Sequence, residues 1–233
     1  MVLIAFATVA ILLICILARI YSILPRSTKT RHSHHSRDSC RLAVFLGSGG
    51  HTSEALSLLS SLDFSRYSPR TYICSAGDLL SAKKAVAVEA AKAAESPSHP
   101  TQETRLNKPY SIITIPRARR VHQSLLTTPL SAARSLAVCL YYVMLLPLIS
   151  GEPFADVVLL NGPGTCCIVC LAIYFSRFFG LPSPKIIYVE SFARVRSLSL
   201  TGKLLRLFVD RFIVQWPDLL RDQGRGECRG WLV

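Results

Sequence analysis

The fold is decided by one stretch near the N-terminus, Arg41-Leu42-Ala43-Val44-Phe45-Leu46-Gly47-Ser48-Gly49-Gly50-His51-Thr52. Its first half is a short apolar run and its second half is a glycine-rich turn. Apolar residues then recur at helical spacing over 55–59. This order predicts a buried strand, a glycine loop and a helix.

The same pattern repeats along the chain. Further strands are predicted at 71–74, 110–115, 156–160, 185–189 and 211–214, with helical patterns between them. Strands that alternate with helices over this length predict a doubly wound parallel α/β sheet, of the Rossmann-like type, with helices on both faces. We expect this domain to cover residues 41–216 and to be followed by a C-terminal tail at 217–233.

One helical pattern, at 125–149, is unusually long and apolar. Pro129 and Pro147 are expected to break it, because proline lacks the backbone N–H that a helix interior needs. The pattern fits either a buried helix or one that grazes a membrane, and the interruptions favour burial.

The N-terminal residues predict a membrane anchor over 1–24. No charge occurs from Val2 to Ala18, and a helix continuing to Leu24 would span roughly 30 Å at about 1.5 Å per residue. A signal peptide would have a basic residue before the apolar run and small residues at a cleavage site, and neither is present. The basic linker at 25–40 places the domain in the cytosol, and Arg19 is expected to reach the lipid headgroups.

The charge and the cysteine content indicate which classes of ligand the protein is expected to bind. The 233 residues include 27 Lys and Arg against 14 Asp and Glu, a net charge of +13, which favours phosphates or acidic membranes. Nucleic acid is not predicted, because no RNA-recognition or zinc-finger pattern occurs. The eight cysteines are expected to be reduced, and no metal site is predicted: Cys166-Cys167-x-x-Cys170 lacks a fourth ligand, and the histidines at 32–35 lie in a polar linker.

Loops after strand ends are the places where such a sheet binds ligands. In Gly47–Thr52, free backbone amides and the helix dipole favour phosphate, although a bare tight turn would look similar. The loop matches neither the P-loop nor the Gly-x-Gly-x-x-Gly pattern, since Thr52, and not glycine, stands at the last position of the second pattern. Asn161–Thr165 presents amides in the same way, or is a plain strand-to-helix turn.

Two more loops carry charge. Glu190–Arg196 places a carboxylate and two guanidinium groups after a strand, as a ligand site or as a surface ion-pair cluster. Pro116–Arg120 offers a cationic rim for a diphosphate or a patch for anionic lipid.

Three segments together, Gly47–Glu54, Asn161–Thr165 and Glu190–Leu205, resemble the membrane-anchor subunit (Alg14 family) of the UDP-N-acetylglucosamine transferase of the dolichol-linked oligosaccharide pathway. The resemblance extends from the anchor to about Trp216. That family resembles the N-terminal, acceptor-side half of the bacterial lipid-linked N-acetylglucosaminyltransferases of the GT-B fold. The half that binds UDP-sugar is missing here.

The resemblance implies a two-chain enzyme, inactive as this chain alone, in the endoplasmic reticulum membrane and the contiguous nuclear outer membrane. A soluble catalytic subunit of the Alg13 type would bind UDP-GlcNAc, and no tightly bound cofactor is implied. The complex would add the second GlcNAc to GlcNAc-diphosphate-dolichol. A membrane-tethered nucleotide- or phosphate-binding protein without transferase activity is the alternative.

The resemblance also implies roles for residues. His51 and Glu190 are candidate catalytic bases. The predicted acceptor- and phosphate-binding residues are Gly47, Ser48, Gly49, Gly50, Thr52, Arg117, Arg119, Asn161, Gly162, Gly164, Thr165 and Arg194. The family ends in a short apolar tail that contacts the partner. Here only Gly230, Leu232 and Val233 resemble that tail, because 221–229 is polar and interrupted by glycine.

Overall fold

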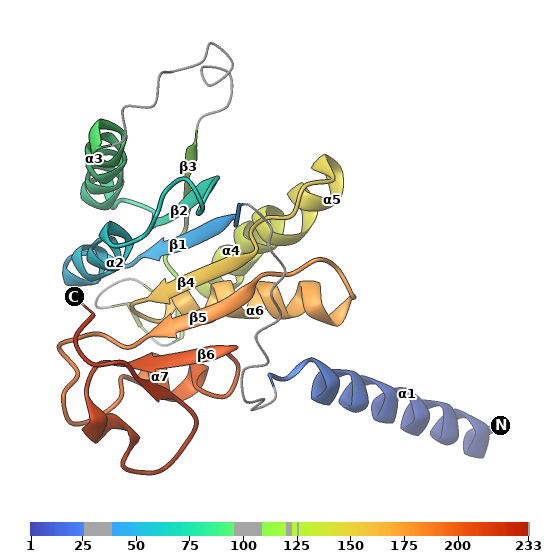
Figure 1. Ribbon diagram of the computed structural model, residues 1–233. Coiled ribbons are helices and arrows are strands. Elements are labelled where there is room, and N and C mark those ends of the chain that lie inside the picture. The colour runs from blue at the N-terminus through green and yellow to red at the C-terminus, as the bar shows by residue number, and fades with distance from the viewer. Residues whose placement is uncertain (26–38, 96–108, 120–122, 125, 233) are drawn as a thin grey trace.

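The computed structural model describes residues 1–25, 39–95, 109–119, 123–124 and 126–232 (Figure 1). The strands are β1 (Leu42–Leu46), β2 (Arg70–Ser75), β3 (Tyr110–Ile115), β4 (Val157–Asn161), β5 (Lys185–Val189), β6 (Arg211–Val214) and β7 (Glu227–Cys228). The helices are α1 (Val2–Ile23), α2 (Gly50–Ser60), α3 (Leu79–Glu95), α4 (Thr128–Leu140), the π-helix η2 (Tyr141–Leu145), α5 (Leu146–Ser150), α6 (Thr165–Phe178), α7 (Leu200–Leu205) and the 3₁₀ helix η3 (Pro217–Leu220).

The described strands form one sheet in the order β3-β2-β1-β4-β5-β6-β7, and each neighbouring pair is parallel. From β1 the chain builds outward to β3, then returns beside β1 as β4 and builds in the opposite direction. The predicted doubly wound parallel sheet is therefore confirmed, and its six predicted strands each end within a residue of their expected positions. The reversal of strand order lies between β1 and β4.

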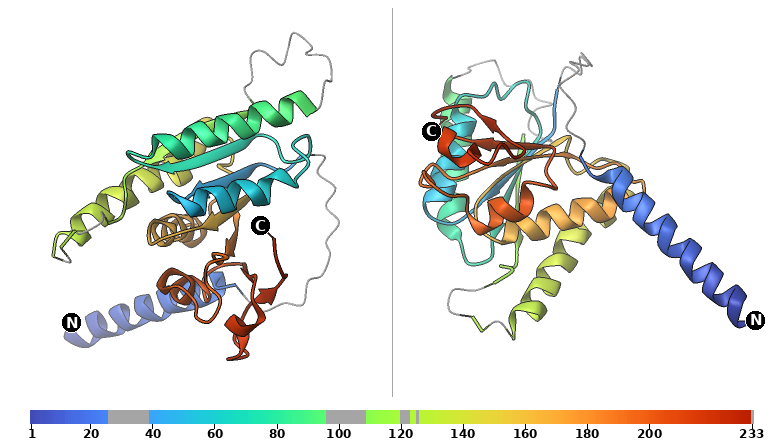
Figure 2. Two further views of the ribbon diagram at one scale, coloured as in Figure 1. Left: turned by 90° about the vertical axis from the view of Figure 1, so that its left-hand side faces the viewer. Right: turned by 90° about the horizontal axis from the view of Figure 1, so that it is seen from below.

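Helices cover both faces of the sheet (Figures 1 and 2). One core lies between the sheet and α2 with α3, and a larger one lies between the sheet and the helices α4, α6 and α7. All five residues of β1 are buried, as expected for a central strand of a parallel sheet that is covered on both sides.

The apolar N-terminal helix forms as predicted. Residues Ile4–Ile23 have a mean hydropathy of 2.5, none of the most apolar window is buried, and the segment is long and apolar enough to cross a membrane. We expected Arg19 to reach the lipid headgroups, but its side chain instead binds the folded domain. Its Nε and Nη2 atoms donate hydrogen bonds to the carbonyl oxygens of Phe178 (3.0 Å) and Arg177 (2.8 Å), at the end of α6. These bonds satisfy helix-terminal carbonyls and fix α1 to the domain.

The long apolar helix differs from our prediction in two ways. It is not broken, because α4, η2 and α5 follow one another without a gap from Thr128 to Ser150. Both prolines are accommodated. Pro129 lies in the first turn of α4, where a backbone N–H would have no partner within the helix. Pro147 directly follows the wider π-helical turn η2 and lies in the first turn of α5. Nor is the helix buried: only 17% of its most apolar window is, and Ser135, Cys139 and Val143 provide its buried residues.

All eight cysteines lie in the described part of the chain, and all carry free thiols. Burial raises the pKa of the Cys74 thiol to about 11 and that of Cys170 to about 12, and it also raises the pKa of Cys166 well above its usual range. These thiols therefore stay protonated at neutral pH and are poor nucleophiles.

We expect alkylation by a maleimide at pH 7.5 to distinguish the exposed from the buried cysteines of the folded full chain. The exposed Cys228 should react first, and Cys74, Cys166 and Cys170 only after unfolding, because they lack both access and thiolate. Mass spectrometry of peptides from the folded and unfolded protein measures this. Labelling of Cys166 in the folded protein at the rate of Cys228 would contradict the buried arrangement.

Candidate functional site

The candidate site lies at the carboxyl ends of β1 and β4, where the strand order reverses. Ligands of doubly wound sheets bind in this crevice. The loops after the two strands touch. A Cβ atom added to Gly47 would lie 3.1 Å from both the carbonyl oxygen of Asn161 and Cδ of Pro163. It would also lie 3.0 Å from Cβ of His51, so only glycine allows this close approach.

The glycine loop has a fixed backbone. Gly49 has a φ of +69°, a conformation that residues with a side chain rarely adopt. The Thr52 hydroxyl donates to the carbonyl oxygen of Gly47 at 2.6 Å and lies 2.6 Å from Oγ of Ser81. Thr52 is therefore buried and engaged within the protein, where it holds the loop against α3.

His51, in the first turn of α2, belongs to a chain of hydrogen bonds that crosses the crevice. Its Nδ1 lies 2.8 Å from Oδ1 of Asn161, and Nδ2 of Asn161 donates to Glu54 at 2.9 Å. The other carboxylate oxygen of Glu54 accepts from the Ser191 hydroxyl at 2.8 Å. The chain thus links α2, β4 and the loop after β5.

The chain of bonds determines which nitrogen of His51 carries the proton. A carboxylate only accepts hydrogen bonds, so the amide of Asn161 must turn its NH₂ group to Glu54 and its oxygen to His51. That oxygen requires a donor, which places the proton of the neutral imidazole on Nδ1. Nε2 is then left with its lone pair, as a general base requires.

Glu190, the other candidate base, has different surroundings. Its side chain is buried, and Oε2 accepts from the backbone N–H of Ser199 (3.1 Å) and from its hydroxyl (3.0 Å). A Cβ atom on Gly202 would overlap the same oxygen. Glu190 thus holds the loop from β5 to the start of α7.

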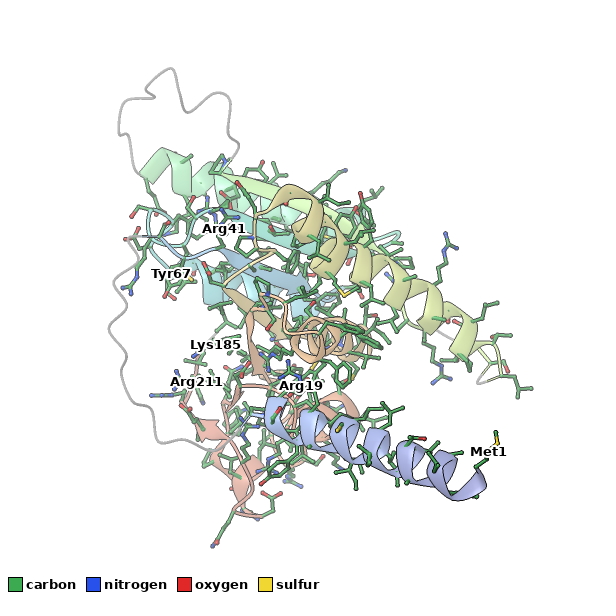
Figure 3. The ribbon with its side chains drawn as sticks, turned by 90° about the vertical axis from the view of Figure 1, so that its right-hand side faces the viewer. Met1, Arg19, Arg41, Tyr67, Lys185 and Arg211 are labelled. Atoms are coloured by element: carbon green, nitrogen blue, oxygen red, sulfur yellow. The ribbon has the colours of Figure 1, made fainter. Side chains whose placement is uncertain are left out.

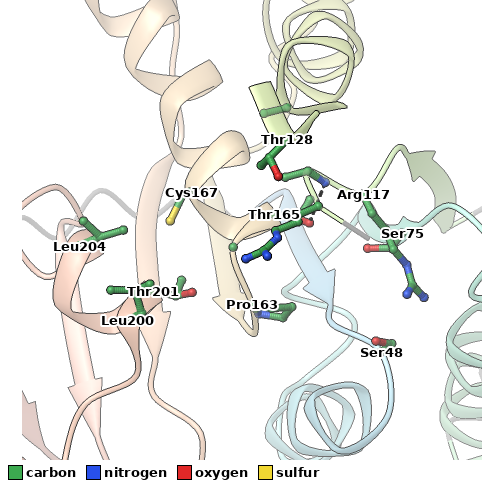
Figure 4. Close-up of a pocket in the computed structure, with 14 residues that line it drawn as sticks. Ser48, Ser75, Arg117, Thr128, Pro163, Thr165, Cys167, Leu200, Thr201 and Leu204 are labelled. Atoms are coloured by element: carbon green, nitrogen blue, oxygen red, sulfur yellow. Dashed lines mark hydrogen bonds between the residues drawn. The ribbon is translucent and has the colours of Figure 1, made fainter. Parts of the chain in front are cut away.

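A cavity of about 680 Å³ opens beside the glycine loop (Figure 4). Its floor is the Pro163–Thr165 turn, α4 and α7 form two of its walls, and polar groups come from the ends of β2 and β3. The residues that line it are Ser48, Ser75, Arg117, Ala118, Arg119, Thr128, Ala132, Pro163, Gly164, Thr165, Cys167, Leu200, Thr201 and Leu204.

Two arginines give the cavity its charge. The loop that carries Arg117 and Arg119 is held in place by its backbone, because the N–H of Ala118 donates to the Thr165 hydroxyl at 3.3 Å. The guanidinium of Arg119 donates to the carbonyl oxygen of Gln123 at 3.1 Å. No carboxylate lines this cavity among the residues that the structure describes. Uncompensated guanidinium groups beside free amides favour a phosphorylated or otherwise anionic ligand.

The structure brings together part of the predicted set. The predicted residues that line the cavity are Ser48, Arg117, Arg119, Gly164 and Thr165. Those that build the loops around it or lie behind it are Gly47, Gly49, Gly50, His51, Thr52, Asn161, Gly162 and Glu190. Arg194 lies on the exposed loop after β5 and does not line the cavity.

For several other residues of the site, no role was predicted from the sequence. Glu54 and Ser191 complete the hydrogen-bond chain of His51. Glu54 follows His51 by three residues, which places both on one face of α2, and this spacing is the signal that could have identified it. Leu200 and Leu204 repeat at four residues on α7, but nothing in the sequence indicates that they face a cavity.

The C-terminal segment packs against the domain near this edge. The rings of Phe192, Trp216 and Trp231 form a cluster with centroids 5.2–5.9 Å apart. The backbone N–H of Leu232 donates to Oε1 of Gln215 at 3.1 Å, and Gly230 has a φ of +71°. Val233 lies outside the described residues. The short strand β7 lies within the segment that we expected to be a tail.

No group of three His, Cys, Asp or Glu side chains within the described part of the chain forms a metal site. The predicted linker histidines lie outside the described residues. Fold and site together define a doubly wound α/β protein with an arginine-lined crevice at the reversal point of its sheet and an apolar N-terminal helix.

Comparisons with known proteins agree with this class. Residues 42–232 match the family described as "Oligosaccharide biosynthesis protein Alg14 like". The chain is 46% identical over 210 residues to the UDP-N-acetylglucosamine transferase subunit ALG14 of Cryptococcus neoformans, covering 89% of this chain and 87% of the relative. The protein of the same name from Schizosaccharomyces pombe is 44% identical (98% and 97% covered), and that from Mus musculus is 38% identical (100% and 99% covered).

Among solved structures, the chain is similar to MurG of Acinetobacter baumannii, with a TM-score of 0.49 and 14% identity over 82% of this chain and 46% of that one. This chain belongs to the Alg14-like family of oligosaccharide biosynthesis proteins.

Proposed function

We propose that this chain is the membrane-anchoring, acceptor-side subunit of a two-chain UDP-GlcNAc transferase that adds the second GlcNAc to GlcNAc-diphosphate-dolichol. The observation that carries the proposal is the arginine-lined cavity beside the glycine loop, in a chain whose relatives are named as subunits of a UDP-N-acetylglucosamine transferase. The acceptor has the chemistry that such a cavity fits: a diphosphate, a sugar and a hydrocarbon tail.

The acceptor diphosphate would lie at the polar end of the cavity. Arg117 and Arg119 would make charge-assisted hydrogen bonds to its oxygens, and the backbone amides of Ser48 and Gly164 offer further donors. The apolar wall of Leu200 and Leu204 suits the start of the isoprenoid chain. The acceptor sugar would then reach toward the crevice between β1 and β4.

His51 is the base that this arrangement favours over Glu190. Nε2 of His51 would take the proton of the attacking acceptor hydroxyl, whose oxygen forms the new bond to C1 of the donor GlcNAc. The bond between C1 and the UDP oxygen breaks, and UDP leaves with the bonding electron pair. Asn161 and Glu54 would act as positioning residues, because they fix the proton on Nδ1.

The donor would be bound mainly by a separate, soluble catalytic subunit that completes the cleft, and this chain would hold no cofactor tightly. The printed name "transferase subunit" of the relatives supports a partner. The C-terminal residues Gly230, Leu232 and Val233 are proposed to contribute to docking. We propose the endoplasmic reticulum membrane as the location because the family acts in oligosaccharide biosynthesis, and a cytosolic domain because a basic segment follows α1.

A transfer assay with two components tests the proposal. Membranes that contain this chain are given UDP-GlcNAc and a GlcNAc-diphosphate-lipid acceptor, with and without the cytosolic fraction of its own source. We expect product only when both fractions are present. Full activity without cytosol would overturn the missing catalytic half, and no activity in either case, with nucleotide bound by the chain alone, would indicate a binding protein instead.

A further inference from the structure

The start of α4 presents two leucines to the outside of the protein. Leu126 is 92% exposed and Leu130 is 78% exposed. Single exposed leucines are common, but Leu126 lies in the turn just before α4 and Leu130 lies in the first turn of that helix, so the two together form one apolar tip at its N-terminal end. Leu200 (75%) and Leu204 (55%) of α7 are exposed as well.

The tip is held rigidly by polar bonds on its inner side. The hydroxyls of Ser131 and Ser135 donate to the carbonyl oxygens of Ala118 and Pro116, each at 2.8 Å. Nε2 of Gln123 donates to the carbonyl oxygen of Thr127 at 3.0 Å. The leucines are therefore held outward by a fixed support.

This tip projects from the same side of the domain as the apolar helix α1. Figures 2 and 3 show the N-terminal ends of α4 and α1 extending beyond the remaining elements on the same side of the domain, with the two helices diverging from each other. The two hydrogen bonds from Arg19 to the end of α6 fix α1 at its junction with the domain. A bilayer that α1 crosses would consequently lie next to the start of α4.

The charges on this layer fit an acidic lipid surface. The sequences of α4 to α5 (128–150), α6 (165–178) and α7 (200–205) contain no Asp or Glu. Their exposed charged residues include Arg134 and Lys203, and Arg119 is exposed beside the start of α4. Apolar side chains flanked by cations, without acidic residues, are the pattern of a segment that lies in the headgroup region.

We propose that the start of α4, together with the exposed leucines of α7 across the cavity, is a second membrane contact, inserted into the interfacial region of the bilayer that α1 crosses. Thr128 and Ala132 of α4 and Leu200 and Leu204 of α7 line the cavity described above, so this contact brings its apolar wall to the level of the lipids. Bilayer lipid is the occupant of this surface.

Depth-dependent quenching in vesicles tests the contact without any enzymatic reaction. The full chain, with Cys15 and Cys228 replaced by serine, is given one reporter cysteine, L130C, that carries an environment-sensitive fluorophore. It is reconstituted in phosphatidylcholine–phosphatidylserine vesicles with or without lipids that carry a nitroxide near the headgroup. The matched control is L79C on α3, which is 75% exposed on the opposite layer.

We expect strong quenching at position 130, blue-shifted emission there, and neither effect at position 79. A second variant, L126D combined with the reporter L204C, should show weaker quenching than L204C alone, because the tip no longer inserts. Equal quenching at 130 and 79 would overturn the proposal. The proposal would also be overturned if the fluorophore at position 130 were shielded from water only in the presence of the cytosolic fraction, because the surface would then bind a protein. Neither result depends on transferase activity, so the two proposals fail separately.

Discussion

Replacing His51 by alanine should lower transfer of GlcNAc in the two-component assay roughly 100- to 10,000-fold, the usual contribution of a general base. The loss should lie in kcat, because no binding role for the ring is needed to explain it. Imidazole added to the H51A variant should restore part of the rate by filling the place of the lost ring. Rescue of this kind separates loss of a base from loss of folding.

The positioning residues give this prediction its control. Glu54→Gln keeps an acceptor for the amide of Asn161 and a group that pairs with Ser191, so most activity should remain. Glu54→Leu removes the hydrogen bonds from Asn161 and Ser191, so the amide of Asn161 is no longer held in one orientation. This variant should lose activity while its thermal stability stays largely unchanged. An active H51A variant, together with an inactive but folded Glu190→Gln variant, would assign the base to Glu190 instead.

Replacing Glu89 by glutamine should lower the free energy of unfolding by about 3–5 kcal/mol, because it leaves a buried arginine without its counter-charge. Arg70 and Glu89 are 3% and 5% exposed, and two hydrogen bonds of 2.6 and 2.8 Å join them. The Tyr72 hydroxyl donates to the same carboxylate at 2.7 Å. The cluster ties α3 to β2, so its loss weakens the attachment of a whole helix.

A second ion pair on the same helix provides the matched control. Lys92 and Glu95 are three residues apart, and the Glu95 side chain is 65% exposed. Glu95→Gln should change stability by less than about 1 kcal/mol, since water screens the pair. Denaturant unfolding of the full chain in detergent, followed by circular dichroism, compares the variants. Equal unfolding midpoints for E89Q and E95Q would show that the buried Arg70–Glu89 pair stabilises the fold no more than the exposed Lys92–Glu95 pair does.

The sheet could be predicted because its strands are local patterns. Residues 42–46 are apolar without interruption and are followed by Gly47, and 157–160 and 186–189 are apolar runs of similar length. The two-residue strand β7 could not be predicted, because Glu227 and Cys228 carry no apolar pattern. They join the sheet at the edge of β6, where the Glu227 carboxylate also accepts hydrogen bonds from Arg211 of that strand.

The candidate site was predictable only in part. The Gly47–Thr52 loop is visible in the sequence because glycines mark it, and Arg117 and Arg119 because they follow a strand. The partner of His51, in contrast, is Asn161, which is 110 residues away. No periodicity connects positions so far apart.

The sequence by itself determined the order of strands and helices, the apolar N-terminal helix and the loops at which a ligand can bind, since these follow from composition and spacing along the chain. Only the tertiary structure decided which face of the helix at Thr128–Ser150 stays exposed, which nitrogen of His51 carries the proton, and that Arg19 joins α1 to α6. Each of these depends on which groups distant in the chain come within hydrogen-bonding or packing distance when the sheet assembles.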